Sequence, residues 1–179
     1  MLASGTKRNT TIMEQNINLL ISGKKNRFAL DGFIAVLGLE AKLQQGPLPF
    51  SKALEALSAD EDDNLLLGIT HRGQHILLED RSSLLEGGIE KHLLAFTRAE
   101  RAEALALTLG DEAGVSWFNY YRDGKLARSV TIEGAEADEI GLETPYEQDG
   151  FHPESVLAAF CDSWKALQKL EWEVYVVLV

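Results

Sequence analysis

The chain has 179 residues, the size of one folded domain, and 28 Asp and Glu against 17 Lys and Arg give a formal net charge of −11. A surface this acidic repels phosphate backbones, which argues against nucleic-acid binding. The longest apolar runs, residues 33–39 and 174–179, are far shorter than the roughly 20 residues that a membrane-spanning helix needs, so no membrane partner is expected.

The N-terminal residues are polar and contain no apolar stretch of the kind found in signal peptides. We expect residues 1–12 to form a disordered tail and residues 13–179 to form a single α+β domain. The single cysteine, Cys161, cannot form an intrachain disulfide, which fits a reducing compartment. The sequence therefore predicts a cytoplasmic protein.

In the N-terminal third, Asn16–Ser22 is predicted as a strand. The next segment has two interpretations, a strand at residues 28–39 or a helix at residues 33–44, because periodicity alone cannot assign short apolar runs. The Gly-Pro-Leu-Pro sequence at residues 46–49 predicts a break, and a short helix should follow at residues 51–57.

The middle of the chain has the clearest strand signals. Residues 64–71 and 74–80 flank Arg72-Gly73 and are predicted as a hairpin. A helix is expected over residues 83–96, since its leucines and isoleucine recur near helical spacing. The alternating leucines of residues 105–109 then predict a strand.

A second hairpin is predicted from residues 115–121 and 125–132, because Asp123-Gly124 suits a type I′ turn. With a regular register, Trp117 faces Val130 on an apolar sheet face that meets the core. The other face carries Phe118 and Tyr120 among small and polar residues. We expect this second face either to be covered by the N-terminal part or to bind a partner.

The C-terminal part predicts a helix at residues 153–168, with an apolar stripe and Pro153 in its first turn, and a buried last strand at residues 171–179. Together these elements predict an α+β fold: a mostly antiparallel β-sheet with several helices packed on it.

Residues 47–132 contain a leucine-ended helix, FSKALEALSAD, then a strand pair and a helix, and then the hairpin sequence VSWFNYYRDGKL at Val115–Leu126. In this order of elements the segment resembles a family of small, uncharacterised bacterial domains associated with polymorphic toxins. The resemblance implies an immunity-like role in binding another protein, and it supplies no catalytic residues.

The connection over residues 133–154 holds eight carboxylates and no Lys or Arg. A connection of about twenty residues is long for a compact domain, and such segments are usually functional or disordered. Carboxylates around apolar anchors would suit a basic protein surface, although a solvated loop explains the same composition. The predicted partner-binding residues are Glu136, Asp138, Glu139, Glu143, Tyr146, Glu147 and Asp149, with Phe118 and Tyr120 from the hairpin.

The residues that suggest chemistry do not form a recognisable site. His71 and His75 should point to opposite faces of their hairpin, so a shared metal ion is not expected there. The acidic run at residues 60–63 lacks the spacing of a calcium loop. Cys161 has the pattern of a buried core residue, although pairing with His92 or His152 is not excluded by the sequence. We expect no catalytic residues, no metal site and no cofactor.

The leading hypothesis is a non-catalytic protein-binding domain, most concretely an immunity protein that masks the active site of a bacterial toxin with an acidic surface. Two alternatives stay open. One is an enzyme with a site assembled from scattered His and acidic residues. The other is an oligomeric adaptor domain whose subunits pair through the Phe118 and Tyr120 face or through residues 174–179. In isolation the chain is expected to be a monomer or a homodimer.

Overall fold

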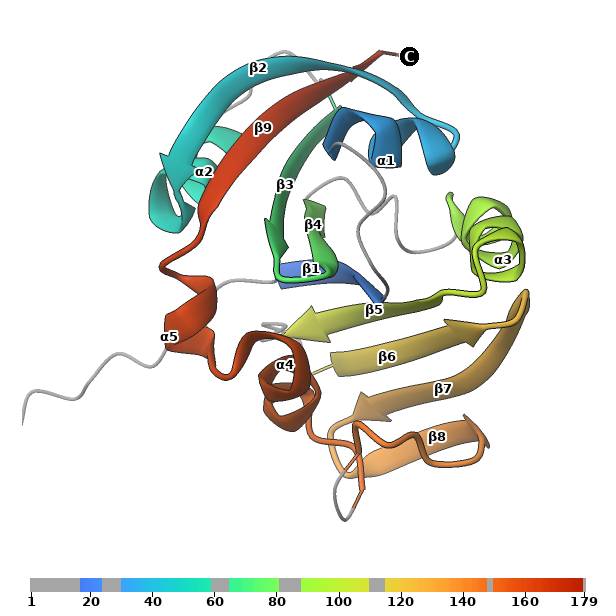
Figure 1. Cartoon of the computed structure of the whole chain (residues 1–179). Coiled ribbons are helices and arrows are strands. Elements are labelled where there is room, and N and C mark those ends of the chain that lie inside the picture. The colour runs from blue at the N-terminus through green and yellow to red at the C-terminus, as the bar shows by residue number, and fades with distance from the viewer. Residues whose placement is uncertain are drawn as a thin grey trace, which may run out of the picture.

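In the computed structural model, the described residues form one nine-stranded sheet, in which the strand order is β2-β9-β3-β4-β1-β5-β6-β7-β8 and each pairing is antiparallel (Figure 1). The structure describes residues 17–23, 30–58, 65–80, 88–109, 115–147 and 150–178. The strands are β1 Ile17–Gly23, β2 Glu40–Pro49, β3 Leu65–Arg72, β4 His75–Asp80, β5 Glu103–Leu109, β6 Val115–Arg122, β7 Lys125–Glu133, β8 Glu136–Gly141 and β9 Glu171–Leu178.

Helices cover both faces of this sheet. The sheet is strongly twisted, so that β2 and β9 run at a steep angle to β5, β6 and β7 (Figure 1). One face is covered by α2, α4 and α5, and the other by α1 and α3. The helices are α1 Leu30–Val36, α2 Phe50–Ser58, α3 Glu90–Ala99, α4 Pro153–Cys161 and α5 Trp164–Leu167. None of the described helices is long and apolar enough to cross a membrane.

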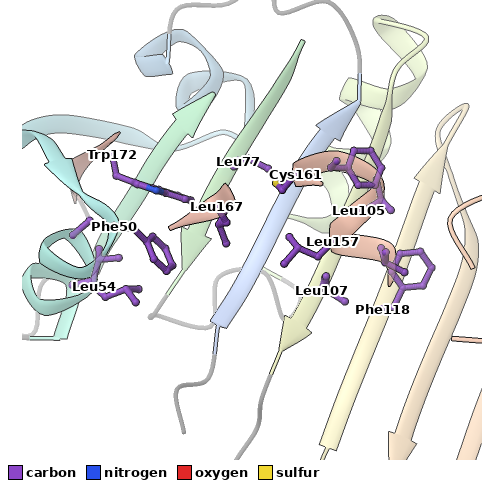
Figure 2. Packing of buried hydrophobic residues seen from close by; sticks show 14 of the residues in the cluster. Phe50, Leu54, Leu77, Leu105, Leu107, Phe118, Leu157, Cys161, Leu167 and Trp172 are labelled. Atoms are coloured by element: carbon purple, nitrogen blue, oxygen red, sulfur yellow. The ribbon is translucent and has the colours of Figure 1, made fainter. Parts of the chain in front are cut away.

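Two hydrophobic clusters lie on the two sides of the sheet because successive side chains of a strand alternate between its faces. In β3, Leu66 belongs to the cluster under α2, whereas Leu67 belongs to the cluster under α1 and α3. In β5, Leu105 packs in the cluster with α4. Figure 2 shows Phe50 and Leu54 of α2 and Leu157 and Cys161 of α4 projecting onto this same face. The sheet is therefore buried on both sides through most of its width.

This architecture confirms the predicted α+β class and the mostly antiparallel sheet. Both predicted hairpins form, and the predicted type I′ turn is present, with positive φ at Asp123 (52°) and Gly124 (74°). The last strand is also confirmed. It is β9, which pairs with β2 on one side and β3 on the other.

Three local predictions were wrong. Of the two interpretations of the N-terminal segment, the helix is the one that forms, as α1. Its expected bounds, residues 33–44, were wrong because β2 already begins at Glu40. Residues 46–49 lie within β2, because an edge strand with register shifts tolerates proline. The predicted helix at 153–168 is divided into α4 and α5 at Asp162, whose φ is +60°. The predicted tail at residues 1–12 lies outside the described residues.

Candidate protein-binding surface

The acidic connection is not a simple loop, because its first part forms strand β8. Residues 136–141 pair with β7 in a continuous antiparallel register that runs from the Glu133–Glu136 pair to the Arg128–Gly141 pair. Gly134 opens the two-residue turn with a φ of +61°, which a type II′ turn requires at its first central position. Among the described residues, β8 is the last strand of the sheet on this side, and all six of its residues are exposed.

A β-bulge in β7 changes the predicted register of the neighbouring hairpin. Tyr121 pairs with Leu126 as expected, but Tyr120 pairs with Arg128, so that Ala127 is the extra residue. Phe118 therefore faces Val130, and Trp117 faces Thr131 instead. Because a one-residue shift exchanges the two faces of a strand, the bulge places the Arg128 side chain on the same face as Tyr120, beneath the segment that follows β8.

Arg128 forms a buried ion pair with Glu147. The Arg128 side chain is 2% exposed and the Glu147 side chain 0%, and Nη2 of the arginine lies 2.7 Å from Oε1 of the carboxylate. Arg128 also donates from Nε to both Glu147 oxygens, at 3.1 and 3.3 Å, and from Nη1 to the backbone carbonyl of Gly141. The backbone N–H of Thr144 donates to Glu147 Oε2 at 2.7 Å. This network attaches residues 141–147 to the sheet.

The ionised state of Glu147 follows from these contacts. Burial raises its pKa, but the hydrogen bonds from Arg128 and from the Thr144 amide and hydroxyl outweigh burial, so the net pKa lies below the ordinary value of 4.5. Glu147 is therefore ionised, and its negative charge is neutralised inside the fold by Arg128.

Gly141 allows the chain to leave β8 close to the bulge. Its φ is +84°, and a Cβ at this position would lie 2.1 Å from the carbonyl oxygen of Ala127. Only glycine fits such a close backbone approach. The bulge, Gly141 and the buried ion pair together fix the positions of Ile140 and Leu142, which flank Gly141.

The result is an exposed surface in which two aliphatic side chains lie among carboxylates. Ile140 is 65% exposed and Leu142 is 88% exposed. Four of the predicted partner-binding residues are exposed around them and form, with them, what we call the β8 surface. Its carboxylates are Glu136, Asp138, Glu139 and Glu143. Of these, Glu139 is half exposed and lies 2.8 Å from Arg128.

Three other predicted partner-binding residues are buried, and their expected exposure was wrong. Phe118 is 0% exposed and Tyr120 4% exposed, because α4 and the acidic segment itself cover their face of the sheet. Phe151 stacks on Phe118 with ring centroids 5.3 Å apart. The third is Glu147, whose partner is Arg128. Asp149 lies outside the described residues.

Tyr146 is half-buried and belongs to a cluster that sequence reasoning missed. Its hydroxyl donates to Glu103 Oε2 at 2.5 Å, and its ring lies edge-on to Tyr120 at 6.0 Å. Burial, with hydrogen bonding to Glu103, raises the pKa of Tyr120 to about 12 and that of Tyr146 further. Both phenols therefore stay protonated to a higher pH than an exposed tyrosine does. The sequence holds no signal for this cluster, because its members are brought together only by the pairing of β5 with β6 and by the anchored turn.

The structure does not bring the candidate catalytic residues together. His71 pairs with Ile76 and Arg72 with His75, so the two histidines lie on opposite sheet faces, as predicted, although the loop is Gly73-Gln74. Cys161 is buried in the cluster under α4, and burial raises the pKa of its thiol to about 11. His152 precedes the first residue of α4, at the other end of the helix from Cys161.

His92 lies on α3, across the sheet from Cys161. The acidic run at residues 60–63 lies outside the described residues. The two surfaces suggested for oligomer formation are also occupied, since both edges of β9 are paired and the Phe118 and Tyr120 face is buried.

Comparison with known proteins gives no match to a family model, to a curated protein or to a solved structure.

Proposed function

We propose that this chain is a non-catalytic protein-binding domain that holds a basic partner against the β8 surface. The observation that carries the proposal is the placement of Ile140 and Leu142, two highly exposed aliphatic side chains, inside a row of exposed carboxylates. An apolar centre with a charged rim is the usual anatomy of a protein–protein interface.

The surrounding charge supports a basic partner. Residues 133–147 carry six carboxylates and no Lys or Arg. Among the described residues, Arg128 forms ion pairs with this segment, and its positive charge is already paired with Glu147 inside the fold and with Glu139 at its border. The exposed carboxylates that remain would attract a positively charged surface and speed its association.

The rigidity of the segment also supports binding. A freely moving loop would lose conformational entropy when it bound a partner. Here β8 is paired along its whole length and the chain beyond it is attached by a buried, hydrogen-bonded ion pair. The surface is thus held in one arrangement before the partner arrives. With the family resemblance of residues 47–132, the specific form of this proposal is an immunity protein that masks a basic cleft of a toxin.

The test is affinity capture from the native lysate at low and high salt, comparing the wild-type chain with a charge-reversed variant. The variant is E136K/D138K/E143K, which spares Glu139 because that residue contacts Arg128. We expect the wild type to retain a stoichiometric basic protein at low salt and to release it at high salt, and the variant to retain at least tenfold less.

A control with the same change in net charge separates the β8 surface from overall charge. It reverses three exposed acids on β2, α3 and β9, namely E40K/E90K/E171K. This control should capture the partner with an affinity close to that of the wild type. Equal losses in both variants, or no basic protein in any of the eluates, would contradict the proposal.

A further inference from the structure

β8 presents backbone hydrogen-bonding groups as well as side chains. In the described sheet it is the terminal strand, and its neighbour is β7 (Figure 1). In a hairpin closed by a two-residue loop, the pair that flanks the loop exchanges both backbone hydrogen bonds, and hydrogen-bonded pairs then alternate along the ladder. Because Glu133 and Glu136 flank the loop, residues 136, 138 and 140 direct their N–H and C=O groups toward β7. The N–H and C=O groups of Ala137 and Glu139 point away from β7, toward the edge that no described strand occupies.

The side chains of β8 follow a pattern along this edge. Every second side chain of β8 lies on one face of the sheet, and these side chains are Glu136, Asp138 and Ile140. Their cross-strand partners in β7 are Glu133, Thr131 and Ser129, respectively. Glu139 lies on the other face, beside Arg128. In chain order, one face therefore presents two carboxylates and then one apolar side chain.

We propose that the partner adds an extended basic strand to β8, antiparallel to it. This inference rests on the proposed function and names its mode: backbone hydrogen bonds at Ala137 and Glu139 supply affinity, and the alternate side chains supply specificity. An antiparallel strand meets Ile140 first and Glu136 last. The segment it fits has an apolar residue followed by Lys or Arg at the second and fourth positions after it, so that each cation lies opposite one carboxylate.

A second copy of this chain is a poor occupant of the same edge. Pairing two β8 strands would bring three carboxylates from each copy, those of Glu136, Asp138 and Glu139, onto one two-stranded ribbon. Like charges opposite each other destabilise a strand pair, and charged side chains are a common protection of sheet edges against self-association. A basic strand instead converts this repulsion into attraction.

The experiment uses the full chain and two synthetic peptides of equal composition. One is Thr-Val-Thr-Lys-Thr-Lys-Thr, whose order suits antiparallel addition, and the other has the reversed order. Residue-resolved amide hydrogen exchange is measured by NMR with and without each peptide. The amides of Ala137 and Glu139 should exchange quickly in the free chain and become at least tenfold slower with the forward peptide. The amides of Asp138 and Ile140, which face β7, serve as internal references.

The variant A137P removes one outward N–H without removing a bond to β7 or a charge. It should bind the forward peptide at least tenfold more weakly than wild type, whereas A137V, which retains the N–H, should bind it within about threefold of wild type. Unchanged exchange at Ala137 and Glu139 at millimolar peptide, or equal protection by both peptides, would overturn antiparallel strand addition.

Protection of the same amides by self-association, without any peptide, would also overturn it. The two proposals can fail separately. Loss of capture by E136K/D138K/E143K with no amide protection would retain the binding surface and reject the added strand.

Discussion

The buried pair of Arg128 and Glu147 gives the sharpest quantitative prediction. Substituting Arg128 by Met leaves the Glu147 carboxylate, 0% exposed, with the Thr144 amide as its strongest remaining donor. Removing one partner of a buried ion pair typically costs about 3–5 kcal/mol, because the other charge is left uncompensated. We expect R128M to lower the free energy of unfolding by an amount in this range.

Substituting both residues should cost far less than either change alone. R128M/E147M leaves no buried charge and replaces the pair by apolar groups, a change that is often close to neutral. It still loses the bonds to the Thr144 amide and the Gly141 carbonyl, so we expect a net cost of about 1–2 kcal/mol. The coupling energy between the two substitutions is then about 3 kcal/mol or more.

The assay is urea unfolding of the wild type, both single variants and the double variant, followed by circular dichroism at pH 7. A coupling energy below about 0.5 kcal/mol would show that the two side chains contribute independently to stability, which contradicts a stabilising buried ion pair. The R128M penalty should also shrink at acidic pH, since protonation of Glu147 removes its uncompensated charge.

Three further outcomes follow from the described contacts. G141A should destabilise the fold by more than about 2 kcal/mol in urea unfolding, because its Cβ would clash with the Ala127 carbonyl. The control G134A, where φ is +61° and no atom lies within 4 Å of the added Cβ, should cost about 1 kcal/mol. Equal costs for the two variants would contradict the close approach at Gly141. Cys161 should react with a thiol reagent orders of magnitude more slowly in the folded chain than in urea, since it is buried and its pKa is raised to about 11; a fast native reaction would contradict its burial. Because the pKa of Glu147 is lower in the folded chain than its ordinary value of about 4.5, the ionised carboxylate stabilises the fold at pH values above 4.5. This stabilisation is lost as the pH falls through the pKa of the folded state. The free energy of unfolding of E147Q should therefore lack this part of the pH dependence.

Short sequence patterns correctly predicted the elements that depend mainly on neighbouring residues, such as tight hairpins and buried strands. Asp123-Gly124 indicated a type I′ hairpin, and the run of β-branched and aromatic residues that begins at Glu171 indicated a buried strand. β8 escaped prediction because Glu, Ala and Asp have low strand propensity. It is a strand because the turn at Gly134 returns the chain alongside β7.

The bulge at Ala127 escaped prediction for a different reason. No local pattern requires it, and its consequence depends on Glu147, a residue twenty positions later. The face of Phe118 and Tyr120 was expected to be covered by the N-terminal part or to bind a partner, whereas the segment after β8, together with α4, covers it. The acidic character of the candidate site could be predicted from composition, but which carboxylates are exposed depends on tertiary contacts.

Amide hydrogen exchange of the full chain, measured with and without the captured basic protein, shows whether the partner contacts the β8 surface. We expect protection on binding to be concentrated in residues 136–143 and to be absent in E136K/D138K/E143K. Protection confined to β2 at the opposite edge, or to the helices, with residues 136–143 unchanged, would contradict contact at the β8 surface.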